Sequence, residues 1–435
     1  MRLFDVLAVL IGFAALFSWL NDRYLKLPNA IGLMLIALVF SLVLLLPFPF
    51  ARELEQEVQR MLASIDFSEA LLQGMLGFLL FAGALHVDLR ELARHKWAIA
   101  ILASASVVGA TVVIGCASWL LFFALGLDVP FIYCMLLGAL ISPTDPVAVL
   151  GILKKAKAPK SLETKITGES LFNDGVAVVV FMLLAGLAAG ETAPAPGSAL
   201  LLFATEIFGG LAFGFVIGWI ALYMIGKTAN YQVEIMVTLA LAMSGYAIAE
   251  HAHVSAPIAI VVAGLMVGSR GRATALTEAT RYRLDDFWEL VDEILNAVLF
   301  VIIGLEVLAI TMTGTFILAG LVAIPLVLVA RLVSVGLPFH LLRRHRHFEP
   351  GFLSILTWGG LRGGISVALA LSLPEDGPRD LILTVTYIVV VFSVLVQGLT
   401  LGPLVRTIAA RSERAKSPRA ARSIDAASGA GRSSA

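Results

Sequence analysis

Apolar runs long enough to cross a lipid bilayer recur along almost the whole chain. A helix needs about 20 such residues to span the hydrocarbon core, and only helices and closed barrels satisfy every peptide group inside lipid. Hydrophobic residues make up 59% of the 435 residues and charged residues only 14%, against about 25% in soluble domains. The chain is therefore predicted to be an all-α polytopic membrane protein.

Turn residues and charges divide this apolar part into thirteen predicted spans. The spans are 3–20, 27–47, 67–86, 97–125, 129–153, 163–189, 198–226, 231–250, 254–268, 287–310, 314–342, 351–373 and 380–408. The first run carries Asp5 and no cleavage site of small residues, so we interpret it as a retained helix. An odd number of spans places the two termini on opposite sides of the membrane.

The Lys and Arg residues between the spans indicate which terminus is cytoplasmic. Segments on the side of the C-terminus hold 25 of the 31, segments on the other side hold four, and two lie within spans. Because cytoplasmic loops carry the excess of basic residues, we predict a protein of the cell's inner membrane, with its N-terminus outside and its C-terminus in the cytoplasm. A missed span would reverse this alternation, and no reversal occurs.

Two segments lie outside the spans. Residues 409–435 are mainly Ser, Ala, Gly and Arg without apolar periodicity, so we predict a membrane domain over 1–408 and a disordered cytoplasmic tail after it. The segment 49–66 alternates charges with apolar residues on one side. This pattern is typical either of a helix lying on the outer membrane surface or of a solvated loop helix.

The sequence has no motif typical of an enzyme. Cys116 and Cys134 lie in apolar runs and form no disulfide or metal framework. His251 and His253 are two residues apart and cannot share a helix face, which argues against a metal site. HExxH, GxSxG, Walker and paired-cysteine motifs are absent. We expect a protein that is not an enzyme, with no cofactor and no nucleic-acid partner.

The predicted span 129–153 is interrupted by two prolines, Pro143 and Pro146, which flank Thr144 and Asp145. Prolines three residues apart remove two backbone donors, so the span should unwind into two half-helices whose freed carbonyls become ligands. Asp145 is placed to offset the positive end of the second half-helix. A simple proline kink is the alternative, but it would leave Thr144 and Asp145 unpaired in hydrocarbon.

A second interruption follows seven spans later. Four glycines surround Arg362 within 359–364, and such a sequence does not form a stable continuous helix. Because seven is odd, the two broken helices enter from opposite sides. This arrangement is typical of an inverted repeat of two six-helix halves, with crossing discontinuous helices and a midplane site. Arg362 is expected opposite Asp145, where it would offset the negative ends of the half-helices.

The span 163–189 carries polar residues on one face. Counted at about 100° per residue from Glu169, the others fall at about 40° (Asn173), 100° (Ser170), 140° (Asp174) and 160° (Thr167). A carboxylate inside a membrane helix marks an ion or proton path by default. Arg331, within another apolar span, needs an acidic partner. Glu169 is the best candidate, which leaves Asp174 as the free carboxylate of the site.

An acidic stretch precedes the tenth span and comprises Asp285, Asp286, Glu289, Asp292 and Glu293. It can serve as a funnel that attracts cations, or it can be a solvated helix start favoured by the helix dipole. We favour the second, more ordinary interpretation.

Four stretches together resemble the electroneutral sodium/proton exchanger branch of the monovalent cation:proton antiporters, which holds bacterial NhaP-like proteins and their eukaryotic relatives. They are SPTDPVAV at 142–149, GESLFNDGVAVVVF at 168–181, ARLVSV with Arg331, and GGLRGGISVALAL at 359–371. The likeness covers about residues 1–408. It implies an NhaA-like antiporter fold and, by resemblance alone, a homodimer in the lipid bilayer.

In that family the aspartate of the Asn173–Asp174 pair binds the ion, together with Ser170 and the main chain of Thr144. With Asp145 from the broken span, the expected cation- and proton-binding set is Asp174, Ser170, Thr144, Asp145 and Asn173. The family also pairs the residues at Glu169 and Arg331. One position departs from its pattern, because many bacterial members have an acid in the third span where this chain has Ala82.

These residues predict exchange by competition. Asp174 would bind either one monovalent cation or one proton, and the loaded site would be exposed alternately to the two sides of the membrane. Because the electrogenic branch has two adjacent aspartates and the first of that pair is here Asn173, we predict electroneutral 1:1 exchange. A compact oxygen cage of Asp174, Ser170 and Thr144 suits sodium or lithium. The alternatives are potassium/proton exchange, or a cation channel or transport-inactive sensor on the same fold.

Overall fold

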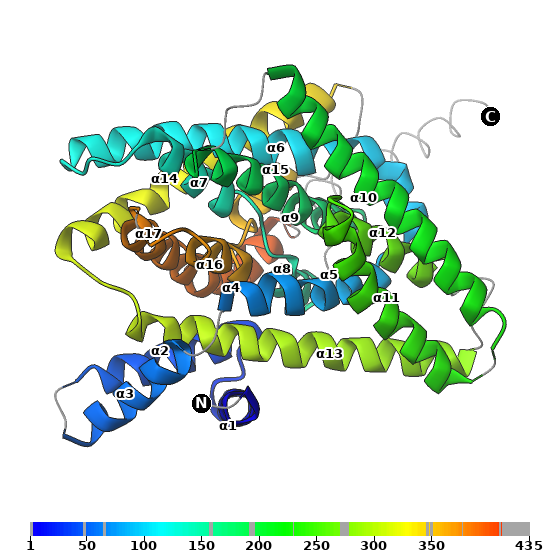
Figure 1. Cartoon of the computed structure of the whole chain (residues 1–435), viewed down its shortest axis with the longest axis horizontal. Helices are drawn as coiled ribbons and strands as arrows, with labels where there is room; N and C mark the ends of the chain where they lie inside the picture. The colour runs from blue at the N-terminus through cyan, green and yellow to red at the C-terminus, as the bar shows by residue number, and fades with distance from the viewer. Residues whose placement is uncertain are drawn as a thin grey trace, which may run out of the picture.

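The computed structural model describes residues 3–46, 49–63, 67–155, 160–190, 196–228, 230–269, 278–344, 348, 351–375, 377–408 and 410. Within these ranges every regular element is a helix, and the helices pack into one bundle (Figure 1). The predicted tail lies almost entirely outside the described residues.

The helices in chain order are α1 (Leu3–Leu20), α2 (Asn29–Leu44), α3 (Pro49–Ala63), α4 (Phe67–Glu69), α5 (Leu76–Leu85), α6 (Leu89–Ala124), α7 (Phe131–Ile141), α8 (Pro146–Lys155), α9 (Lys160–Ala188), α10 (Pro196–Ile225), α11 (Tyr231–His251), α12 (Ala256–Met266), α13 (Glu278–Leu305), α14 (Gly314–Leu342), α15 (Phe352–Trp358), α16 (Gly364–Leu371) and α17 (Arg379–Phe392). Helical turns join α4 to α5 and extend α17, so that continuous helices run over Phe67–Leu85 and Arg379–Ile408.

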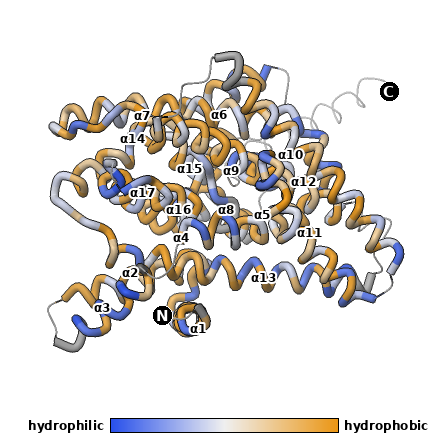
Figure 2. The backbone as a smooth tube through the Cα atoms, in the orientation of Figure 1, coloured by the Kyte–Doolittle hydropathy of each residue, from blue (hydrophilic) through white to orange (hydrophobic). Residues whose placement is uncertain are grey.

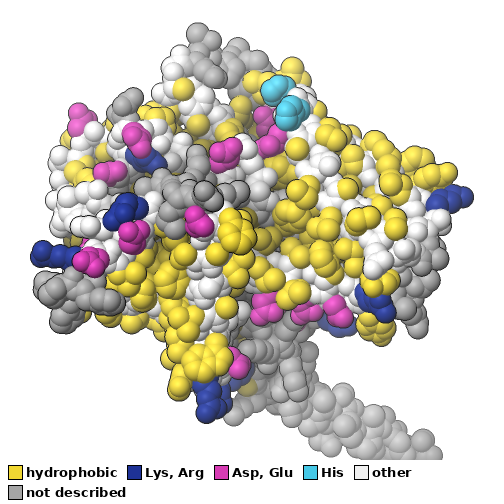
Figure 3. Space-filling model, turned by 60° about the horizontal axis from the view of Figure 1, so that its bottom comes forward, with side chains coloured by type: hydrophobic (Ala, Val, Ile, Leu, Met, Phe, Trp, Pro, Cys, Tyr) yellow, Lys and Arg dark blue, Asp and Glu magenta, His cyan; other side chains and the backbone are white. Residues whose placement is uncertain are grey.

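The surface of the bundle is that of a membrane protein. Eight helices in the described part are long and apolar enough to cross a bilayer. Apolar residues dominate them along their length (Figure 2), and a broad hydrophobic area lies on the face shown in Figure 3, with charged side chains on both sides of it. Phe4, Phe123 and Phe208 are each more than two-thirds exposed. Apolar exposure on this scale needs a lipid environment, so the polytopic all-α prediction is confirmed.

The number of membrane crossings stays a prediction. Each of the thirteen predicted segments overlaps a helix or a pair of short helices. Three of the matching helices, α2, α7 and α12, are apolar but shorter than a full span. The inverted repeat also stays a prediction.

Helix α3 falls in the segment for which we considered a membrane-surface helix or a solvated loop. Its apolar side is buried, since Val58, Met61 and Leu62 are each less than 10% exposed. The amide of Gln59 donates to the main-chain oxygen of Leu308 over 2.8 Å. The apolar side of α3 is therefore covered by the protein itself, which neither interpretation had anticipated.

Two predicted spans are each divided into two short helices, as the prolines and glycines indicated. Helix α7 ends at Ile141 and α8 begins at Pro146, while α15 ends at Trp358 and α16 begins at Gly364. The first interruption lies close to helix α6: a side chain at Gly138 would collide with the main chain of Thr111. Helix α9 packs against both α6 and α7. The polar face of α9 is thus held beside the first interruption.

Candidate functional site

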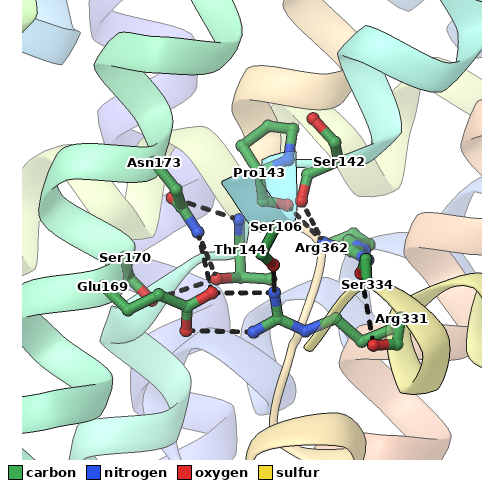
Figure 4. A network of polar contacts seen from close by, with 10 residues as sticks. All are labelled: Ser106, Ser142, Pro143, Thr144, Glu169, Ser170, Asn173, Arg331, Ser334 and Arg362. Carbon is green, nitrogen blue, oxygen red and sulfur yellow. Dashed lines mark hydrogen bonds and ion pairs between the residues drawn. The ribbon is translucent and has the colours of Figure 1, made fainter. Parts of the chain in front are cut away.

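The two interruptions lie against each other at the centre of the bundle. The main-chain N–H of Asp145 donates to the main-chain oxygen of Leu361 over 2.8 Å. Arg362, which is 2% exposed, donates through Nη1 to the main-chain oxygens of Ser142 and Pro143, both at 2.7 Å (Figure 4). These carbonyls belong to the negative end of α7, so the guanidinium offsets that end.

Arg331 of α14 and Glu169 of α9 form a buried ion pair with two contacts. Nη1 lies 2.7 Å from Oε1 and Nη2 lies 3.0 Å from Oε2 (Figure 4). Both side chains are at most 3% exposed. A two-pronged guanidinium–carboxylate contact is the geometry that best offsets the loss of water around both charges. A longer contact of 3.5 Å joins Arg331 to the hydroxyl of Ser106 on α6.

Asn173 ties helix α9 to the first interruption. Its amide nitrogen donates to Thr144 Oγ1 over 2.8 Å, and its amide oxygen lies 3.5 Å from the main-chain nitrogen of Thr144. The hydroxyls of Thr144 and Ser170 are 3.1 Å apart. Figure 4 shows these groups in one continuous polar network that also includes Glu169 and Arg331. We refer to this set (Thr144, Glu169, Ser170, Asn173 and Arg331) as the brace.

Asp174 lies on the other flank of α9, beside a cavity of about 290 Å³. The side chain is 4% exposed. Within the described residues its carboxylate makes neither a hydrogen bond nor an ion pair. Asp145 borders the same cavity, which reaches the surface beside the exposed side chains of His86 and Glu289. A buried carboxylate without a partner is costly unless it holds a proton or a cation.

The structure divides the residues that the sequence grouped into one site. Asp174 and Asp145 line the cavity, whereas Ser170, Thr144 and Asn173 do not. The angles around α9 account for this, because Thr167 at about 160° also lines the cavity and Glu169 at about 0° faces Arg331. Ser170 lies between the two flanks, and its hydroxyl contacts Thr144. The predicted cage of Asp174, Ser170 and Thr144 stays a prediction.

The cavity also contains residues that were not assigned to the site from the sequence. Glu289, Asp292 and Asn296 line it from α13, and Ala82 and His86 line it from α5 and the turn that follows. The spacing of 289, 292 and 296 places these three on one helix face. That spacing, within a stretch interpreted as an ordinary helix start, was the available signal.

The two histidines near the end of α11 lie in different local structures. Helix α11 ends at His251, and His253 follows in a turn with φ of +53°. No group of three or more His, Cys, Asp or Glu residues among those described has the geometry to hold a metal ion.

Known proteins resemble this chain over almost its full length. The family model described as sodium/hydrogen exchanger, transmembrane, matches residues 10–407. The Na+/H+ antiporter NhaP of Pseudomonas aeruginosa is 51% identical over 421 residues, which cover 95% of this chain and 99% of the relative. The Na+/H+ antiporter NhaH of Halobacillus dabanensis is 35% identical over 393 residues, which cover 89% and 93%.

The fold matches that of a solved antiporter. The structure of the sodium proton antiporter MjNhaP1 from Methanocaldococcus jannaschii at pH 8 superimposes with a TM-score of 0.73 over 94% of this chain and 99% of that one, at 18% sequence identity. The predicted antiporter fold is confirmed. Since the family model spans nearly every described helix and the relatives match from end to end, the chain belongs to the transmembrane sodium/hydrogen exchanger family.

Proposed function

We propose that this protein exchanges sodium, and also lithium, for protons across the inner membrane of the cell. The observation that carries the proposal is the carboxylate of Asp174, which is buried, makes no hydrogen bond or ion pair within the described residues, and borders a cavity that reaches one surface. The proposal is supported by the relatives in Pseudomonas and Halobacillus, which carry the name Na+/H+ antiporter.

Competition for Asp174 couples the two ions. The empty carboxylate is disfavoured in the membrane, so it moves between the two exposures only when it holds a proton or a cation. A proton leaves on the side where protons are scarce and a cation takes its place. Ser170 and Thr144 enter the ion's shell when the cavity closes: Ser170 lies one helical turn before Asp174 on α9, and its hydroxyl contacts that of Thr144 from the first interruption. Asn173 and Asp145 hold this site in position.

The exchange is 1:1 and electroneutral. One carboxylate trades one positive charge for another, and Glu169, the other acid of the face, is neutralised by Arg331. Asn173 adds no charge. Each cycle therefore carries no net charge, and the membrane potential does not drive it.

The cavity opens to the cytoplasm. It reaches the surface beside His86, which precedes α6, and Glu289, in the first half of α13, on the side where the sequence concentrates its basic residues. The N-terminus is then outside and the C-terminus inside. From the family resemblance we further propose that the protein works as a homodimer in the bilayer.

The test is proton-gradient dissipation in everted membrane vesicles, followed with a pH-sensitive dye. Sodium, lithium and potassium are added in turn to vesicles with the wild-type protein or the Asp174→Ala variant. We expect dissipation with sodium and lithium from the wild type and none from the variant. As pH falls, more Asp174 is protonated, so the sodium concentration for half-maximal rate should rise while the maximal rate stays constant. A response to potassium alone would replace sodium as the substrate.

Proteoliposomes separate the exchanger from a channel and test the charge balance. A cycle that moved one net charge would gain about 2.3 kcal/mol per 100 mV, or roughly a 50-fold bias. We expect sodium uptake to change less than about twofold when such a potential is imposed. A current in the absence of a proton gradient, or one that persists in Asp174→Asn, would contradict coupled exchange.

A further inference from the structure

The wall of the cavity opposite α5 is acidic. Three carboxylates border the cavity below its mouth, from Asp145, Asp174 and Asp292. No Lys or Arg is found among the described residues that line it. Like charges in a low-dielectric cleft raise one another's free energy, and a cation lowers it. Such a cavity therefore attracts cations and holds them. At about 290 Å³ it has room for a cation with several waters.

Helix α13 presents its polar residues to the cavity as a ladder. Glu289, Asp292, Asn296 and Leu299 line it in this order. At 1.5 Å per residue, Asp292 is roughly 10 Å along the helix from Leu299. Leu299 marks the depth of the second interruption, because a side chain at Gly364 would collide with it. The ladder thus runs from the exposed Glu289 at the mouth to the level of the two interruptions.

The register of this ladder is fixed by an aromatic cluster. Trp288 is fully buried, its ring centroid lies 4.6 Å from that of Phe81 on α5, and its indole N–H donates to Thr238 Oγ1 over 3.0 Å. Trp288 is one turn before Asp292 on α13, and Phe81 is next to Ala82 on α5. The packing of these rings therefore places Asp292 on the cavity wall that faces α5.

Asn296 provides an oxygen that has no protein partner. The side chain is 6% exposed and borders the cavity. Its amide nitrogen donates to the main-chain oxygen of Asp292 over 2.8 Å, and its amide oxygen accepts no hydrogen bond from the residues described. This oxygen is therefore available to water or to a cation in the cavity. It lies one turn deeper than the carboxylate of Asp292.

Asp145 links this wall to the exchange site. Its charge acts on Asp174 and on Asp292, each of which has Asp145 as an electrostatic neighbour. On the α5 wall, by contrast, the residues deeper than His86 are apolar, and Ala82 offers no oxygen. Apart from Asp174 itself, the carboxylate and amide groups that line the cavity therefore come from α13 and Asp145.

We propose that Asp292 and Asn296 form an entry site, where the cation is held with part of its water before it reaches Asp174. This rests on the proposed cation/proton exchange and names residues that set its cation affinity. The entry site holds no proton that is exchanged. It raises the local cation concentration, so it determines the sodium concentration at half-maximal rate and leaves the coupling to Asp174 unchanged.

The test is a sodium titration in everted vesicles that hold equal amounts of the wild type, Asp292→Asn and Glu293→Gln. Glu293 is the matched control, because it is adjacent on α13 but points away from the cavity and accepts from Asn29 over 3.2 Å. For Asp292→Asn we expect the half-maximal sodium concentration to rise roughly 5- to 20-fold, the effect of one partly screened carboxylate, with the maximal rate within about twofold. Glu293→Gln should match the wild type.

Adding Ala82→Glu to Asp292→Asn supplies a carboxylate from the opposite wall of the same cavity and should recover most of the lost affinity. If Asp292→Asn leaves the half-maximal sodium concentration unchanged, the entry site is wrong. If Ala82→Glu does not lower that concentration again in the double variant, the carboxylate of Asp292 does not act through the cavity that both walls share. A complete loss of exchange at every sodium concentration would make Asp292 part of the carrier and overturn the proposal too. The wild-type vesicles test the proposed function separately. If they show no cation-driven proton flux, the proposed exchange is wrong, whatever the variants do.

Discussion

Helix α9 carries two acids, one on each flank, and their surroundings differ. Glu169 contacts Arg331 through both carboxylate oxygens and is sealed from the cavity. Asp174, five residues later, makes neither a hydrogen bond nor an ion pair in the described part of the chain and borders the cavity. Both side chains are almost completely buried. Burial alone therefore does not distinguish an acid that is paired with a guanidinium from one that is unpaired.

The difference between the flanks lies in what neutralises each charge. The ion pair of Glu169 and Arg331 within the brace supplies its own counter-charge, so these two residues need no ion. The cavity flank has no counter-charge, so its charge must be met by something that can enter and leave. An exchanger needs both flanks, because the rigid flank holds the helix in place while the cavity flank binds and releases ions. The predictions below separate the two flanks by asking which variants alter transport and which alter stability.

The largest effect is expected for Asp174→Asn. The amide keeps the shape but holds neither a proton to exchange nor a charge for the cation, so cation-driven proton flux should fall by more than about 100-fold. The same change removes an unpaired buried charge, so the apparent melting temperature in detergent should stay the same or rise. Flux in vesicles and melting of the purified protein are measured side by side. A variant that both transports nothing and melts early would place Asp174 in the brace.

This division could be predicted from the sequence only in part. Arg331 needed an acidic partner, and the angles around the helix indicated Glu169 for that role and left Asp174 free. The structure shows the same arrangement, with Glu169 paired to Arg331 and Asp174 beside the cavity. Asp292 could not be placed in this way. The helix begins at Glu278, earlier than the acidic stretch had indicated, so Asp292 lies in the middle of α13. Whether an acid there faces water or a cavity depends on the packing of another helix, here of Trp288 against Phe81, and no spacing within α13 reveals that contact.

For the brace, Glu169→Gln should lower stability. Removing one partner leaves the charge of Arg331 buried without an opposite charge, at a cost of about 3–5 kcal/mol. Adding Arg331→Met should recover part of the loss, since no lone charge remains. The matched control is Glu375→Gln, which breaks an exposed ion pair with Arg379 and should leave the melting temperature unchanged. If the double variant melts no higher than Glu169→Gln, the two residues do not act as a pair.

The fold shows a similar limit of sequence reasoning. Pro143, Pro146 and the glycines around Arg362 marked both interruptions, because proline and clustered glycine act on the local backbone. That the interruptions meet, through Asp145 and Leu361, was inferred from their opposite directions. The burial of α3 was not foreseen, since an amphipathic pattern shows which side is apolar and does not show whether lipid or protein covers it.

Two glycines of the second interruption allow a finer comparison of the flanks. A side chain at Gly363 would collide with the carboxylate of Asp145, whereas one at Gly360 would lie 2.8 Å from Nε of Arg331. Overpacking of this kind costs roughly 1–3 kcal/mol. We expect Gly363→Ala to slow exchange about tenfold, with a small loss of stability, and Gly360→Ala to lower the melting temperature more than the rate. Equal effects of the two variants on rate and melting would show that the flanks are not independent.

The smallest effect is expected for Ser106→Ala. The hydroxyl of Ser106 is 3.5 Å from Arg331, at the limit of a hydrogen bond, and Glu169 already satisfies both terminal nitrogens of the guanidinium. Its loss should cost under about 1 kcal/mol, with no change in the sodium concentration at half-maximal rate. Ser104→Ala, two residues earlier, is the control for helix α6, because the hydroxyl of Ser104 donates to the main-chain oxygen of Ala100. If Ser106→Ala lowered stability as much as Glu169→Gln does, the brace would depend on α6 as much as on its ion pair. The rigid flank would then extend beyond α9 and α14.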